Sequence, residues 1–174
     1  GFESSHLDAH QLTFRSVPTS ILVLQTIYNR SMKKNASQYF GSRSYQILTH
    51  QLQEIITLRF QNNITVALDF LMGYHKNIVG SEKSNQYNLS FDFDYRIKEK
   101  GTVALKLQYI SILYNAKEDN ALAYEMLQGL TKGNNFLWNL AYQTKLFEYL
   151  QLNLQYEGRV TNDKRVIHTG FLQL

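Results

Sequence analysis

The chain has 174 residues, enough for one domain with a sizeable core, and only 18% of them are charged. This is below the usual quarter for globular proteins, and Asn, Gln, Ser, Thr and Tyr take the place of the missing charges. The net charge of +4 is modest and the basic residues are spread along the chain, which argues against a nucleic-acid partner. The chain has no cysteine, so disulfides and thiolate metal sites are excluded.

Composition and alternation both predict strands. The chain has 12 Tyr, 10 Phe and a single Pro, and aromatic side chains favour a pleated surface. Alternation of apolar and polar residues predicts nine strands, in chain order at 6–16, 20–30, 44–60, 63–75, 86–98, 102–115, 135–147, 149–161 and 165–174. One short helix is expected at 121–128, because Asp119-Asn120 can cap its start and Gly129 stands where a helix ends.

The connections alternate between tight and long. Tight ones are expected at 17–20, 61–63, 98–101 and 147–149, and longer ones at 31–43, 76–85, 116–134 and 162–164. This alternation is typical of an up-and-down outer-membrane β-barrel with short periplasmic turns. No run of about eighteen apolar residues is present, so a closed barrel is the structure with which this chain would cross a bilayer.

The apolar face of the strands is expected to touch lipid. Aromatic residues stand near both ends of the strands, Tyr28, Tyr45 and Tyr114 among them, and aliphatic residues fill the middle, as in the aromatic girdles of membrane proteins. The predicted lipid-facing residues are Tyr74, Tyr87, Phe91, Phe93, Tyr95, Phe136, Trp138, Leu152, Leu154 and Tyr156. The predicted lumen-facing residues are Asp92, Asp94, Arg96, Lys106, Lys145, Glu157 and Arg159, and His168 is also expected in the lumen.

Two alternatives stay open. A soluble β-sandwich would bury the same apolar face in a core, although its strands are usually shorter. Bacterial single-chain barrels have an even number of strands, so nine suggests either a larger barrel of ten or more strands or, if residues 6–16 do not span, eight. We expect residues 1–174 to be a single barrel domain and the C-terminal part of a longer chain.

The last third of the chain resembles a known group of proteins. Its pieces are Tyr109-Ile110-Ser111-Ile112, the segment AYEMLQGL at 123–130, Asn135-Phe136-Leu137-Trp138-Asn139-Leu140, the segment at 150–159 and Arg165-Val166-Ile167-His168-Thr169-Gly170. With these pieces the chain is similar to the C-terminal β-barrel region of outer-membrane proteins from Bacteroidota of the flavobacterial type. The resemblance implies a barrel at the end of a long surface or periplasmic protein, but it does not point to any particular activity.

Few residues suggest chemistry. Asp92 and Asp94 point the same way and could form an acid/base pair, but mixed charges are ordinary in a polar lumen. His6 and His10 share a strand face without the further ligands that a metal needs. Lys33-Lys34 and Lys76, expected in long outer loops, could meet lipopolysaccharide phosphates, or could simply be solvated. Nucleotide-binding and nucleophile motifs are missing, so we expect no enzyme, no cofactor and no metal.

These observations predict a protein of the bacterial outer membrane. The favoured function is a non-catalytic membrane anchor or structural subunit of a larger assembly, such as secretion or barrel-assembly machinery. Its expected partners are outer-membrane lipid, lipopolysaccharide and other outer-membrane or periplasmic subunits, with no nucleic acid. A pore or transporter is the first alternative, and a soluble β-rich binding module is the second.

Overall fold

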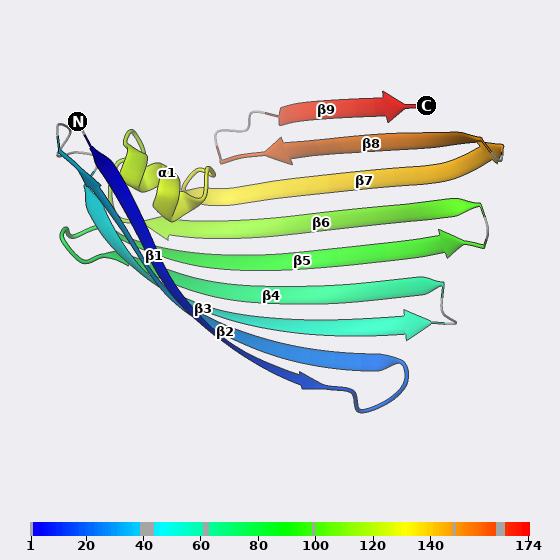
Figure 1. Cartoon of the computed structure of the whole chain (residues 1–174), viewed down its shortest axis with the longest axis horizontal. Helices are drawn as coiled ribbons and strands as arrows, with labels where there is room; N and C mark the ends of the chain where they lie inside the picture. The colour runs from blue at the N-terminus through cyan, green and yellow to red at the C-terminus, as the bar shows by residue number, and fades with distance from the viewer. Residues whose placement is uncertain (1, 39–43, 61–62, 99, 148, 163–165) are drawn as a thin grey trace.

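The fold is all-β, with one short helix. The computed structural model describes residues 2–38, 44–60, 63–98, 100–147, 149–162 and 166–174. Within these residues, nine antiparallel strands form a single up-and-down sheet whose strand order follows the chain (Figure 1). The strands are β1 (Glu3–Ser16), β2 (Leu22–Ser37), β3 (Tyr45–Phe60), β4 (Ile64–Asn77), β5 (Lys83–Ile97), β6 (Gly101–Tyr114), β7 (Gly133–Phe147), β8 (Leu150–Val160) and β9 (Val166–Gln173), and the helix is α1 (Ala121–Leu127).

The structure confirms the nine expected strands and the helix. β1 pairs with β2 from Glu3 to Ser16, so residues 6–16 do form a strand of the sheet. The connections lie alternately at two ends of the sheet, which we call the tight-turn end and the long-loop end. Two long loops are shorter than expected, because β2 continues to Ser37 and because β4 and β5 reach Asn77 and Lys83. Residues 31–37 have no clear alternation, and their backbone pairing with β1 keeps them extended.

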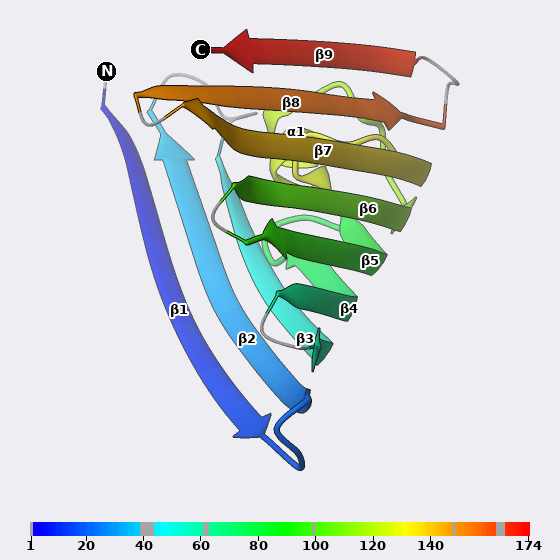
Figure 2. The same ribbon diagram turned by 90° about the vertical axis from the view of Figure 1, so that its right-hand side faces the viewer.

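The sheet is strongly curved and open. Figure 2 shows β1 and β2 turned far from the direction of β6 to β8, so that the single layer forms a trough. Within the described residues β1 and β9 pair on one side only and form the two edges. The expected antiparallel up-and-down arrangement is therefore present, whereas closure into a barrel is not seen.

Helix α1 packs inside the trough at the long-loop end. It begins at Asn120, whose side-chain Oδ1 accepts a hydrogen bond of 2.7 Å from the backbone N–H of Ala123, and Gln128 ends it in the left-handed conformation. Leu122 and Met126 pack on Tyr45 and Ile47 of β3.

The other side of α1 contacts β6. Ala123 and Leu127 pack on Ile110 and Ile112. Tyr114 of β6 packs both against this group and against the group that α1 forms with β3. The helix thus spans the concave side from β3 to β6. Tyr45 and Tyr114, expected in the lipid-facing aromatic ring, instead contact α1, because they lie at concave positions of their strands.

The cap of α1 makes a testable contribution to stability. Asn120→Ala is expected to weaken the docking of α1 by about 1 kcal/mol, because the backbone N–H of Ala123 loses its acceptor. Hydrogen exchange of the amides of 121–127 measures this loss. Asp119→Ala, next to the cap in an exposed position, is the control and should change the exchange rates little.

Candidate functional site

The sheet has two chemically distinct faces. The pairing register places residues in rows across the strands, for example Leu68, Phe91 and Leu107. Every residue of such a row points to one side of the sheet. All ten predicted lipid-facing residues share the side opposite α1, which we call the convex face. All seven predicted lumen-facing residues share the side on which α1 lies, the concave face.

The apolar face is the more exposed one over a large part of the sheet. From mid-strand to the long-loop end of β4 and β5, the convex Leu68 and Leu89 are 47% and 52% exposed. Their polar concave neighbours His75 and Ser90 are 4% and 0% exposed. A soluble domain has the opposite distribution, with apolar side chains inside. Among the described residues, no second layer of the protein covers the convex face.

Aromatic and histidine side chains form hydrogen-bonded groups on the convex face. Tyr156 Oη shares a hydrogen bond of 2.7 Å with His168 Nδ1, and the His168 ring also lies 5.6 Å from that of Trp138. Trp138 lies directly on Gly158, where a side-chain carbon would collide with the indole. The expectation of His168 in the lumen is therefore wrong, because the register places it beside Gly158 on the convex side.

The concave face is polar, with charges of both signs. Lys106 Nζ lies 3.3 Å from Asp92 Oδ1, and Glu157 lies in the same row, two strands away. Asp94 occupies the next row, opposite Ala104. Asp92 and Asp94 thus share a face, but Lys106 is paired with Asp92, which supports the interpretation of a mixed-charge wall over that of an acid/base site.

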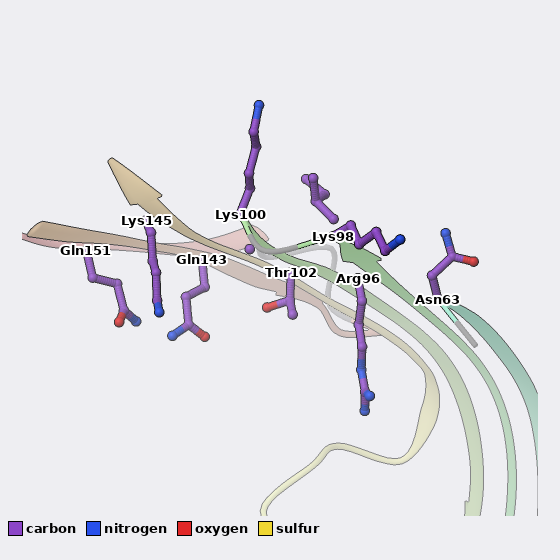
Figure 3. A pocket seen from close by; sticks show the side chains of 10 residues that line it. Asn63, Arg96, Lys98, Lys100, Thr102, Gln143, Lys145 and Gln151 are labelled. Atoms are coloured by element: carbon purple, nitrogen blue, oxygen red, sulfur yellow. The ribbon is translucent and has the colours of Figure 1, made fainter. Parts of the chain in front are cut away.

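Cationic residues gather at the tight-turn end. Arg96, Lys98, Lys100 and Lys145 line a cavity of about 720 Å³ together with neutral polar groups such as Thr102. Figure 3 shows Arg96, Thr102, Gln143, Lys145 and Gln151 projecting to the same side, and Lys100 to the opposite side. Among its described lining residues there is no carboxylate, so this cavity suits anionic or polar solutes.

Helix α1 fills the concave side at the opposite end. Lys33 Nζ of β2 lies 2.6 Å from Glu125 Oε2 of the helix, and both side chains are about one-third exposed (35% and 33%). The expectation that Lys33, Lys34 and Lys76 lie in loops is wrong, because the first two belong to β2 and Lys76 belongs to β4. Lys34 and Lys76 lie on the convex face near the long-loop end. On the same face His75 of β4 is buried, and its Nδ1 shares a hydrogen bond of 3.0 Å with Thr49 Oγ1 of β3.

Other candidates bring no further groups together. His6 and His10 share the convex side of β1, and His10 Nε2 lies 3.4 Å from Asp8 Oδ1. In the described part of the chain, no three His, Asp or Glu side chains gather as a metal site would require. None of the described residues belongs to a helix long and apolar enough to cross a membrane.

Comparisons of the chain with family models, curated proteins and solved structures found no match. The resemblance of residues 102–174 to outer-membrane proteins of Bacteroidota thus stays a prediction.

Proposed function

We propose that this chain forms part of the wall of an outer-membrane β-barrel and serves as a non-catalytic membrane anchor or structural subunit of a larger assembly. The observation that carries the proposal is the inverted exposure of β4 and β5, where leucines are half-exposed and polar residues are covered. Hydrocarbon chains are the environment in which such a face is stable without a second protein layer.

The dimensions of the strands support the same proposal. Eight of the nine described strands have 11 to 16 residues, whereas a tilted transmembrane strand needs about nine to eleven. A soluble sandwich would need a second sheet against the convex face, and the described residues all belong to one sheet or to its connections. A soluble sandwich therefore explains the strand length and the exposed convex face less well than a membrane barrel does.

Closure requires more than these nine strands. β1 and β9 both run from the long-loop end to the tight-turn end. A strand antiparallel to both edges can bridge them, so an odd number of further strands would complete an even-numbered, fully antiparallel barrel. Unpaired backbone groups are costly in hydrocarbon, which favours such closure in the membrane.

The position of α1 favours an anchor over an open conduit. The helix spans the concave side between β3 and β6 and buries Met126 and Leu127 almost completely. A plugged barrel suits a structural subunit that binds other outer-membrane or periplasmic proteins. Lys34 and Lys76, exposed on the convex face near the long-loop end, are positioned for lipopolysaccharide phosphates at the outer surface.

A pore is the second candidate. The polar concave face and the cationic cavity at the tight-turn end favour it, because both would be wetted in a closed barrel. Single-channel recordings in planar bilayers separate the two functions. The anchor predicts no steady conductance, whereas a pore predicts discrete steps with anion preference.

Membrane extraction tests the proposal itself. We expect the expressed protein to stay in the membrane fraction at high salt and alkaline pH, to require detergent for release, and to show heat-modifiable mobility on gels. A compact monomer that dissolves in buffer, with Leu68 and Leu89 protected from solvent, would contradict the proposal.

A further inference from the structure

Four cationic side chains occupy equivalent positions in the sheet. The strands β1, β3, β5 and β7 all run towards the tight-turn end. Each of them has a cation one or two residues before that end, namely Arg15, Arg59, Arg96 and Lys145. The register places all four on the concave face, Arg59 for example in the row of Asp94. We call these four residues the cationic rim.

Within the described residues, no carboxylate pairs with the rim. All four cations are exposed. Across each tight hairpin the cation is opposite a neutral polar residue, in the pairs Arg15 and Gln25, Arg59 and Thr65, Arg96 and Thr102, and Lys145 and Gln151. Glu99 and Glu148 of the adjoining turns lie outside the described residues and are not counted in the rim.

Two other cations of the concave face are paired. Lys106 Nζ lies 3.3 Å from Asp92 Oδ1, and Lys33 Nζ lies 2.6 Å from Glu125 Oε2. Arg96 and Lys145 of the rim instead border the cavity of about 720 Å³ and project to the same side (Figure 3). Unpaired cations on a protein wall attract anions, so the rim is suited to an anionic partner.

The width of the rim favours a polymer over a small solute. The register separates Arg59 from Arg96, and Arg96 from Lys145, by two strands and two residues along the strand. Strand spacing and residue rise then give about 12 Å between successive α-carbons, or about 24 Å from β3 to β7. A single small anion would contact only one or two of these cations, whereas an extended peptide of about seven residues spans all three.

We propose that the cationic rim docks an acidic, extended segment of a periplasmic protein subunit. The inference rests on the proposed function, because in a closed barrel the concave face lines the lumen and the tight-turn end opens to the periplasm. Lipid headgroups would meet the convex face instead. Carboxylates on one side of an extended segment recur at intervals of two residues, so every second one would reach a successive cation of the rim.

Binding of an acidic peptide to the full chain tests the proposal. The probe is a fluorescent peptide of about twelve residues in which glutamate and serine alternate, so that an extended conformation places its carboxylates on one side. Fluorescence anisotropy in uncharged detergent micelles measures the dissociation constant. We expect binding at low salt that weakens as salt is added, and no binding of a peptide with glutamine in place of glutamate.

Neutral variants locate the binding site. Arg59→Gln, Arg96→Gln and Lys145→Gln are each expected to raise the dissociation constant about 3-fold, and the triple variant about 30-fold, because each removes one exposed ion pair. The matched control removes three exposed cations at the long-loop end, with Lys83→Gln, Lys117→Gln and Lys132→Gln, and should leave the constant nearly unchanged. Equal losses in the two triple variants would reduce the effect to net charge and overturn the proposal.

A competing small anion tests the choice of partner. Inorganic phosphate should displace the peptide poorly, because it contacts the cations one or two at a time. Phosphate that displaces the peptide at the same concentration of negative charge would make the rim a small-anion site and would overturn the docking of a segment.

A cysteine experiment covers the case in which the rim variants do not fold. The chain has no cysteine, and Thr102 lies opposite Arg96 at the cavity. Thr102→Cys should react faster with a thiol-reactive form of the glutamate peptide than with the glutamine form. Ser81→Cys, exposed near the long-loop end, should react equally with both. Equal rates at Thr102→Cys would contradict the proposal.

Failure of this inference is distinguishable from failure of the proposed function. A protein that requires detergent for extraction but does not bind the glutamate peptide overturns the docking site alone. A protein that dissolves in buffer overturns the proposed function and, with it, the periplasmic location of the rim.

Discussion

Arginine in place of Leu107 is expected to destabilise the protein in a bilayer, lowering its free energy of unfolding by about 2–4 kcal/mol. Leu107 lies at mid-strand on the convex face, between Phe91 and Trp138, where an arginine side chain would have to enter hydrocarbon. Urea titration of the protein refolded into phospholipid vesicles measures the loss, followed by the fluorescence of the single tryptophan.

Two control variants show whether lipid is the cause. Tyr95→Arg, near the tight-turn end of β5, should cost only about 0–1 kcal/mol, because an arginine there reaches the headgroups. Ala104→Arg, on the concave face opposite Asp94, should also cost little. A packed protein core would instead make the Tyr95 variant as damaging as the Leu107 variant, and that result would contradict the membrane proposal.

The second large effect is expected at Met126 of α1. Met126→Ala should weaken helix docking by about 2–5 kcal/mol, because this fully buried side chain packs against Tyr45 and Ile47 of β3. A seven-residue helix has little stability of its own, so we expect it to leave the sheet. Limited proteolysis between residues 115 and 132 measures the release.

Tyr124 provides the matched control on the same helix. Its side chain is exposed, so Tyr124→Ala should change docking by no more than about 0.5 kcal/mol. The strands should keep their protection from hydrogen exchange in both variants, because strand pairing does not involve α1. Equal proteolysis of the two variants would show that Met126 does not hold the helix in place.

Much of the sheet was predictable because alternation has a direct physical cause. Side chains of a strand point alternately to two sides, so residues such as Phe91 and Asp92 are assigned to opposite faces without knowledge of the fold. The capped helix was predictable for a similar reason, since Asn120 satisfies a backbone N–H within its own segment.

The remaining features depend on contacts between distant segments. Alternation separates Tyr45 from its neighbours but does not reveal that α1, about eighty residues later, covers it. The face on which His168 lies is likewise decided by the pairing of β9 with β8, which places it opposite Gly158. The extension of β2 to Ser37 likewise depends on its pairing with β1, since residues 31–37 carry little apolar signal of their own.

Sheet order that follows chain order has a kinetic consequence. Each strand pairs with its immediate predecessor, so the sheet can grow by successive addition of hairpins, with short loop closures at every step except the one that includes α1. During such growth β1 and the most recently added strand each have unsatisfied backbone groups on one side, so both edges of the nascent sheet are prone to mispairing, and the second edge changes with every strand that is added.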